Sequence, residues 1–201
     1  METIRLAIVG CGGMGHRHLY ALAELQRAGL SRFELVGACD PVTANAESLA
    51  EQAEELLGSR PTVVGAMAGL VALDVQAVDI TTTPRYHHNL AIEALDHGWH
   101  AMVEKPVGLT VRACNLIRTA AAKSDRVVSV AENYRRDPIN RTVGKHRARQ
   151  RRHRRARFMI HNYGRRRQPD DDLGLAPPEG PERRAAGRGR PFCGHHGILH
   201  G

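Results

Sequence analysis

The chain has 201 residues, of which 42% are hydrophobic, and a formal net charge of +8 at pH 7. This length suits one well-buried domain of about 100–200 residues plus an added segment, and it is short for two full domains. No apolar run approaches the roughly 18 residues of a membrane span, and the start lacks the basic region of a secretion signal. We therefore expect a cytoplasmic protein without a membrane partner.

The charge is divided unevenly along the chain. Residues 1–143 contain 14 Lys and Arg against 16 Asp and Glu, a net charge of −2. Residues 144–201 contain 15 against 5, a net charge of +10. The two parts therefore require separate interpretations.

Short apolar runs alternate with amphipathic stretches through the first part of the chain. The pattern predicts strands over 4–10, 33–40, 75–83, 99–106 and 126–134, and helices over 18–30, 43–57, 89–98 and 111–123. Residues 61–73 predict a further strand and a short helix, although Gly65 and Gly69 interrupt them. Alternating strands and helices imply a parallel sheet covered on both faces, so residues 1–140 are predicted to form an α/β, doubly wound Rossmann domain.

The glycine-rich sequence VGCGGMG lies between the first predicted strand and the first helix. Its spacing is GxGxxG, with Gly10 at the tight turn, Gly12 where backbone approaches a pyrophosphate, and Gly15 where helix and strand pack closely. Gly13 and Met14 complete the loop, whose helix N-terminus offers free N–H groups to phosphates. The motif predicts dinucleotide binding; a tight turn without a ligand is the alternative.

Asp40 ends the second predicted strand, 25 residues after Gly15. A carboxylate at this place accepts hydrogen bonds from the adenine-side ribose. It would repel a 2′-phosphate, and the following residues, 41–43, include no arginine to hold one. The cofactor is therefore predicted to be NAD, with NADP less favoured; the alternative is that Asp40 only caps the next helix.

The run AVDITTTPRYHHNLAIEALDHGWHAMVEKP, together with the glycine motif, resembles the Gfo/Idh/MocA oxidoreductases over about residues 3–140. The resemblance implies residues that line the cofactor near its nicotinamide half, and a Glu-Lys-Pro tripeptide that reaches the catalytic pocket. In the family the proline peptide of this tripeptide is often cis. The residues that the resemblance implicates are Thr82, Thr83, Pro84, His88 at the head of a helix, Glu104, Lys105, Pro106 and Asn133.

Lys105 is the catalytic residue that the resemblance implies. A lysine beside the nicotinamide can hydrogen-bond a substrate hydroxyl and help move its proton as hydride leaves the same carbon. The alternative is a solvated surface lysine. The implied function is an NAD-dependent dehydrogenase of a sugar, inositol or related polyol, and relatives of this kind form homo-oligomers.

The cysteines and histidines do not predict a metal site. Cys11, Cys39, Cys114 and Cys193 lack zinc-ligand spacing, and we interpret them as reduced, structural thiols. The histidines at 16, 18, 87, 97 and 100 have neither i, i+4 pairing nor acidic neighbours in the sequence, and they are assigned no function.

Residues 141–201 are predicted to be an incomplete, disordered remnant of an α+β second domain. Their Arg-rich blocks have little periodicity, so one interpretation is a basic arm that binds nucleic acid nonspecifically. The other is a frameshift, because back-translation with a one-nucleotide shift makes three blocks compatible with family-like sequence, including a Gly-Gly, an acidic residue and a His. We favour the frameshift, which makes nucleic acid an unlikely partner.

A frameshift would remove the catalytic acid and histidine of the substrate half. We assign neither role to the tail residues Asp170, Asp171, Asp172, His195 and His196. The chain as written is then expected to bind NAD with weak turnover or none, and its oligomerisation is doubtful. A nucleotide-binding protein without catalysis is the alternative function.

Overall fold

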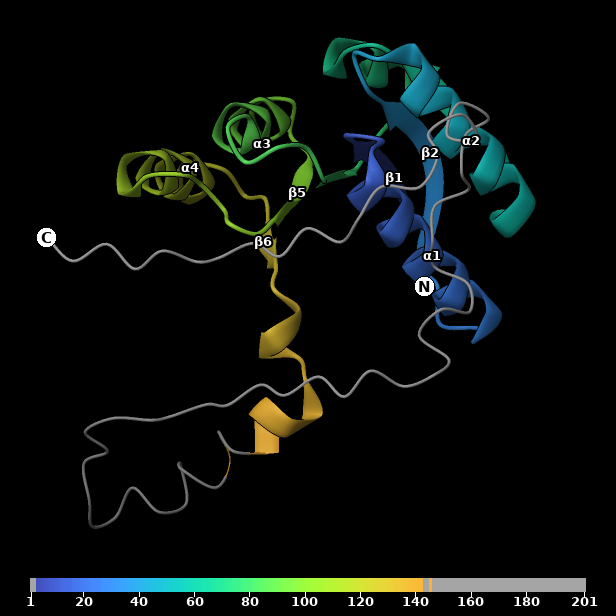
Figure 1. Ribbon diagram of the computed structural model, residues 1–201. Helices are drawn as coiled ribbons and strands as arrows, with labels where there is room; N and C mark the ends of the chain where they lie inside the picture. Colours follow the sequence, from blue (N-terminus) through green and yellow to red (C-terminus); the bar gives the residue numbers. More distant parts are fainter. Residues whose placement is uncertain (1–2, 143–144, 146–201) are drawn as a thin grey trace, which may run out of the picture. The chain divides into compact units, whose positions relative to one another are not determined.

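The computed structural model describes residues 3–142 and 145 (Figure 1). The described chain contains a six-stranded parallel sheet in the order β3-β2-β1-β4-β5-β6. This order confirms the predicted Rossmann fold. The strands are Ile4–Val9 (β1), Phe33–Cys39 (β2), Thr62–Val64 (β3), Ala77–Ile80 (β4), His100–Glu104 (β5) and Val128–Ala131 (β6).

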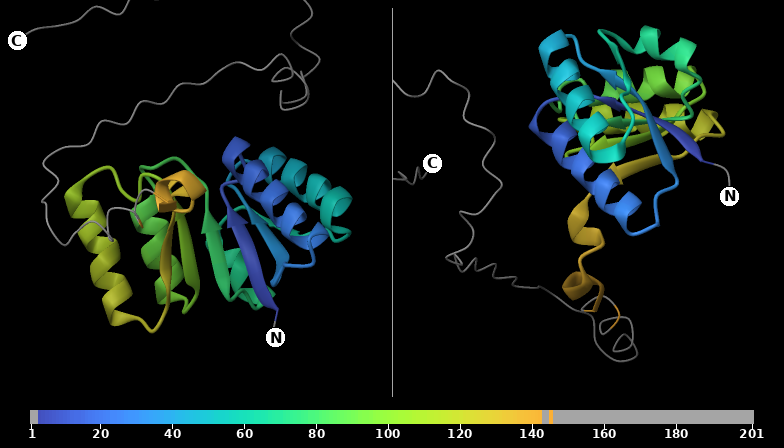
Figure 2. Two further views of the ribbon diagram at one scale, coloured as in Figure 1. Left: turned by 90° about the horizontal axis from the view of Figure 1, so that it is seen from below. Right: turned by 90° about the vertical axis from the view of Figure 1, so that its right-hand side faces the viewer.

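The helices form two pairs, on the two sides of the sheet (Figure 2). Helix α1 packs beside α2, and α3 packs beside α4. Strand order reverses between β1 and β4, which creates a crevice at the carboxyl ends of these strands. The helices are Gly13–Arg27 (α1), Thr43–Leu57 (α2), His87–Asp96 (α3) and Val111–Lys123 (α4), with 3-10 helices at Met67–Leu73 (η1) and Asn133–Arg135 (η2).

The helix ends follow local chemistry. The Thr110 hydroxyl caps α4 by accepting the Ala113 N–H at 3.1 Å, and α2 ends at Gly58, whose φ of 78° favours glycine. The bounds predicted for α2 and α4 are confirmed, as are the strand and short helix predicted over 61–73. Helix α1 begins earlier than predicted, because the last glycines of the motif form its first turn.

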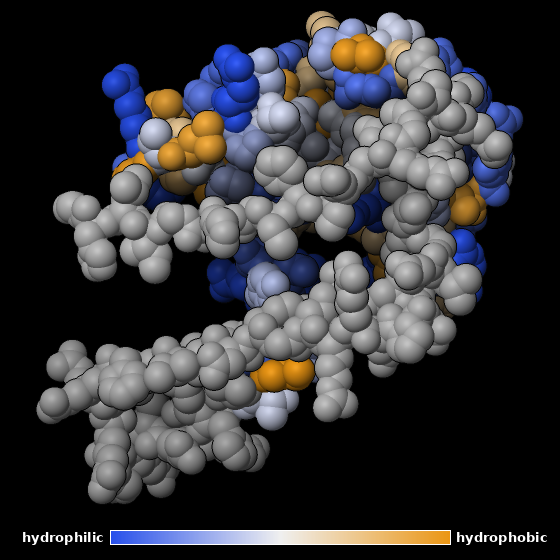
Figure 3. Space-filling view, viewed as in Figure 1, coloured by the Kyte–Doolittle hydropathy of each residue, from blue (hydrophilic) through white to orange (hydrophobic). Residues whose placement is uncertain are grey.

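The core lies on both faces of the sheet. On one face Ile8 packs with Leu19 and Leu49 of α1 and α2; on the other, Ile80 and Val103 pack with residues of α3 and α4. The thiols of Cys11 and Cys39 are buried, and burial is the main cause that raises their pKa values to about 12 and about 11. Exposed apolar side chains form separate patches on the face shown in Figure 3.

Within residues 3–142, no helix is long and apolar enough to cross a bilayer. Nearly all of the predicted remnant over 141–201 lies outside the described residues, and so do the basic-arm and frameshift interpretations that concern it.

Candidate functional site

A hollow of about 990 Å³ lies at the crevice, at the carboxyl ends of the strands. Loops that follow β1, β2, β4 and β5 all reach it. Open α/β sheets bind their ligands in this position. Of the predicted site residues, the cavity is lined by Gly10, Gly12, Gly13, Met14, Asp40, Thr82, Thr83, Pro84, Glu104 and Lys105.

The glycines of the loop have different surroundings. At Gly10 the φ of +98° favours glycine, and an added Cβ would lie 2.7 Å from the Thr82 backbone nitrogen. At Gly15 it would lie 2.5 Å from the Gly10 carbonyl oxygen. At Gly12 and Gly13 a Cβ would have no atom of residues 3–142 within 4 Å, so these glycines leave the cavity wall open beside the α1 N-terminus.

Gly12 is the N-cap residue of α1. Among the described residues, no side chain caps this helix end by accepting a hydrogen bond from its first turn. The first N–H groups of a helix lack partners within the helix and carry partial positive charge, so they suit an anionic group. The accessible backbone of Gly12 and Gly13 and the uncapped N-terminus of α1 thus lie together at one wall of the cavity.

Asp40 is buried beside the glycine loop. Its Oδ2 accepts the Cys11 N–H at 2.9 Å, and its Oδ1 accepts the Val42 N–H at 2.8 Å. These bonds hold the turns after β1 and β2 together. The side chain does not cap α2, whose N-cap is Val42. Each carboxylate oxygen has a second lone-pair direction, so Asp40 can accept further hydrogen bonds from a ligand.

The loops after β4 and β5 also line the cavity. The Thr81 hydroxyl donates to the Gly10 carbonyl oxygen at 2.6 Å, which joins the end of β4 to the glycine loop. The Lys105 side chain is exposed at the cavity, and its backbone N–H donates to Glu104 Oε2 at 2.8 Å. The Lys105–Pro106 peptide is cis, as the resemblance implied.

His87 is the buried member of the His87–His88 pair. Its ring nitrogens lie 2.8 Å from the Pro106 carbonyl oxygen and 3.0 Å from that of Thr82, so it links the two loops. His88 is half-buried and does not line the cavity. Asn133 is exposed in η2, also outside the lining. Cofactor roles for His88 and Asn133 stay predictions.

The burial of His87 could have been predicted from helical periodicity. Ala91, Ala94 and Leu95, at spacings of four, seven and eight residues from His87, are the other buried residues of α3. These spacings define one helix face. His87 begins that face, whereas His88 is offset from it.

A charged cluster under the cavity was missed in the sequence. His18 of α1 has Nδ1 at 2.7 Å from Asp79 Oδ2 and Nε2 at 3.3 Å from Glu104 Oε1. The hydrogen bond to Asp79 raises the pKa of His18, although burial alone would lower it. The sequence offers His18 no acidic neighbour, because its carboxylates come from strands that are distant in the chain. Asp79 within an otherwise apolar strand was the available signal.

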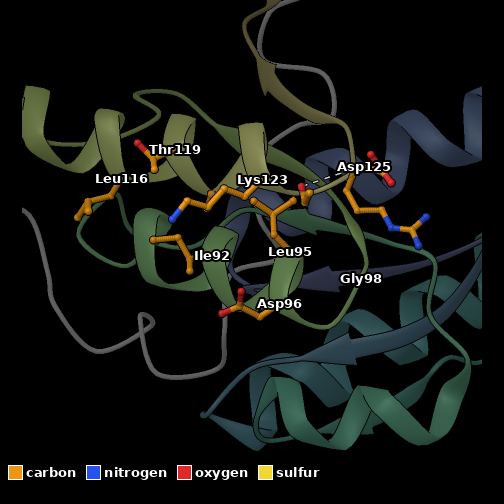
Figure 4. A pocket seen from close by; sticks show the side chains of 11 residues that line it. Ile92, Leu95, Asp96, Gly98, Leu116, Thr119, Lys123 and Asp125 are labelled. Atoms are coloured by element: carbon orange, nitrogen blue, oxygen red, sulfur yellow. Dashed lines mark hydrogen bonds between the residues drawn. The ribbon is translucent and has the colours of Figure 1, made fainter.

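A second hollow of about 600 Å³ lies between α3 and α4 (Figure 4). It is flanked by Ile92 and Leu95 of α3 and by Leu116 and Thr119 of α4. The residues that follow these helices, at the amino ends of β5 and β6, also line it. It therefore lies away from the ligand-binding edge. In the described part of the chain, no group of three or more His, Cys, Asp or Glu side chains could hold a metal ion.

Residues 4–132 match the family model of the GFO/IDH/MocA oxidoreductases, described as an NAD-binding Rossmann fold. The chain is similar to a D-apiose dehydrogenase of Paraburkholderia graminis, with 31% identity over 145 residues, 72% of this chain and 36% of that protein. It is also similar to an α-N-acetylgalactosaminidase of Shewanella oneidensis, with 28% identity over 66% of this chain and 29% of that protein.

Among solved structures, the fold resembles the WlbA dehydrogenase of Chromobacterium violaceum in complex with NADH and UDP-GlcNAcA. The TM-score is 0.62 and the identity 26%, covering 75% of this chain and 41% of the other. The chain thus spans about a third of the length of these curated relatives and two fifths of that structure.

Proposed function

The chain belongs to the Gfo/Idh/MocA family of oxidoreductases, and on this premise we propose that its cavity binds NAD as the cofactor half of a sugar or polyol dehydrogenase. The observation that carries the proposal is the wall formed by Gly12 and Gly13. Because neither glycine has a Cβ atom, this wall leaves open space beside the N-terminus of α1, which no described side chain caps. A pyrophosphate has the size and charge for such a place.

The described residues fit the other parts of the cofactor as well. Asp40, whose carboxylate accepts the Cys11 and Val42 N–H groups, would also accept hydrogen bonds from the adenine-side ribose. The nicotinamide half would then lie at the loops after β4 and β5, where Thr82 and Lys105 line the cavity.

The nicotinamide of a bound NAD would accept or return a hydride. Lys105 is the proposed catalytic residue, because its ammonium group can hydrogen-bond a substrate hydroxyl and take part in moving its proton. Glu104 and Thr82 lie on the same wall of the cavity.

Replacing Gly12 by valine is expected to weaken cofactor binding strongly without unfolding the protein. The backbone at Gly12, with φ −79° and ψ −165°, is open to any residue, and an added Cβ would meet no atom of the described residues within 4 Å. The side chain would instead fill the space proposed for the pyrophosphate. NADH fluorescence titration of the full chain should show affinity lower by about 100-fold, equal to about 2.8 kcal/mol.

The matched control is Ala122→Val on the exposed side of α4, which should bind NADH like the unchanged protein. Circular dichroism and urea unfolding would establish that both variants are folded. If the unchanged protein does not bind NADH, or if Gly12→Val binds it as tightly, the proposal is wrong.

Asp40→Asn is expected to reduce the preference for NAD over NADP. The substitution removes the negative charge that would repel a 2′-phosphate, and the described cavity lining contains no arginine. The ratio of the NADP and NAD dissociation constants should fall by about tenfold, which corresponds to about 1.4 kcal/mol. Asp40→Asn also changes the hydrogen bonds to the Cys11 and Val42 N–H groups, and any affinity lost in this way is common to both cofactors. It therefore cancels in the ratio of the two dissociation constants. An unchanged ratio would show that Asp40 does not select the cofactor.

Turnover, substrate, partners and location stay proposals, because the chain spans only part of its relatives. One relative is a glycosidase, so cofactor binding is a more direct test than dehydrogenation. We retain a cytoplasmic location, a domain boundary near residue 140, and weak or absent turnover as predictions. A frameshift after residue 143 can be checked by sequencing that part of the gene.

A further inference from the structure

His18 joins three elements of the fold at one point. It comes from α1, Asp79 from β4, and Glu104 from the end of β5. The side chains of Asp79 and Glu104 are only 2% and 9% exposed, and that of His18 is 17% exposed. A charged cluster so far removed from water requires a reason beyond general solubility.

The hydrogen-bond geometry gives each ring nitrogen a separate partner. A protonated imidazole donates from Nδ1 to Asp79 and from Nε2 to Glu104, and the pKa of His18 is raised, which favours this form. Among the described residues, Asp79 Oδ1 has no partner, so Asp79 depends on His18 for its hydrogen bond. Glu104 is different, since its second oxygen accepts the Lys105 N–H.

The connection therefore runs from α1 to the cavity wall. One carboxylate oxygen of Glu104 is hydrogen-bonded to His18, and the other accepts the backbone N–H of Lys105. Glu104 and Lys105 both line the cavity on the side where the nicotinamide half is proposed to lie. His18 itself does not line the cavity, so it can act on a ligand only through Glu104.

We propose that His18 is a positioning residue that fixes the Glu104–Lys105 segment for the nicotinamide half of the cofactor. This inference rests on the proposed function, because it assumes that the cavity binds NAD. The competing explanation is purely structural: His18 would serve only to pair the buried Asp79 carboxylate. The two explanations differ in which ring nitrogen matters.

Two substitutions separate the ring nitrogens. The amide nitrogen of asparagine lies close to the place of Nδ1, so His18→Asn can still donate to Asp79 but cannot reach Glu104. The amide nitrogen of glutamine lies close to the place of Nε2, so His18→Gln can still donate to Glu104. If His18 acts through Glu104, glutamine should restore its function and asparagine should not.

The measurement compares NADH with ADP-ribose, which lacks the nicotinamide, by titration of the full chain. His18→Asn is expected to weaken NADH by about tenfold, as loss of a charged hydrogen bond can, while ADP-ribose stays within about twofold. His18→Gln should keep the ratio of the two dissociation constants close to that of the unchanged protein. Urea unfolding of each variant reports on the structural role independently.

Glu104→Gln provides a second path if His18→Asn fails to fold. Like His18→Asn, it should lower the preference for NADH over ADP-ribose. The variant that carries both substitutions should lose no more of this preference than the single variant with the larger loss. An unchanged ratio in folded Glu104→Gln or His18→Asn overturns the inference, as does an equal loss for both ligands. If the unchanged chain binds neither ligand, the proposed function itself falls, and this inference with it.

Discussion

Gly15→Ala is expected to destabilise the protein severely, by about 3 kcal/mol or more. The new Cβ would lie 2.5 Å from the Gly10 carbonyl oxygen and 3.2 Å from Leu49 Cδ1. The Gly10 carbonyl cannot move away freely, because it also accepts the Thr81 hydroxyl at 2.6 Å. Relief of the clash would require α1 to separate from the sheet. Urea unfolding followed by circular dichroism should show a midpoint shifted strongly to lower urea.

Gly13→Ala is the matched control, since it is the same substitution two residues earlier. A Cβ at Gly13 meets no protein atom within 4 Å, and alanine is the better helix residue by roughly 0.5–1 kcal/mol. Its unfolding midpoint should therefore equal or slightly exceed that of the unchanged protein. Equal midpoints for Gly15→Ala and Gly13→Ala would refute the close approach of α1 to the glycine loop.

His87→Leu is expected to cost about 2–5 kcal/mol of folding stability, because buried polar groups lose their partners. The His87 side chain is fully buried, and the carbonyl groups of Thr82 and Pro106 have no other hydrogen-bond donor among the described residues. Leucine fills a similar volume but donates no hydrogen bond. The two loops it joins should also become less ordered, which amide hydrogen exchange at Thr83 and Lys105 would detect as faster exchange.

His88→Leu is the control for this second experiment. The His88 side chain is half-buried, and no hydrogen bond from it occurs within the described residues. Its replacement should change stability by less than about 0.5 kcal/mol, as is usual for substitutions away from special contacts. A larger loss for His88→Leu than for His87→Leu would reverse the assignment of the buried histidine.

Sequence patterns were sufficient for features that depend on neighbouring residues. The GxGxxG spacing, the acidic residue after β2 and the ends of α2 and α4 follow from local chemistry, namely backbone freedom, strand ends and helix caps. The bounds of α2 and α4 agree with the structure, while the cofactor roles of the loop and of the acidic residue stay proposals. The doubly wound sheet also followed, because alternating strands and helices with right-handed crossovers permit few other arrangements.

Tertiary structure decided the features whose partners are distant in the chain. Asp79 and Glu104 are 61 and 86 residues from His18, and they meet it only because β4 and β5 are adjacent in the sheet beneath α1. The choice between His87 and His88 likewise depended on which ring faces the loop after β5. Sequence by itself thus determined the fold and the position of the glycine loop in this protein. Only packing between separate segments decided which histidines support the site, because hydrogen bonds form between neighbours in space.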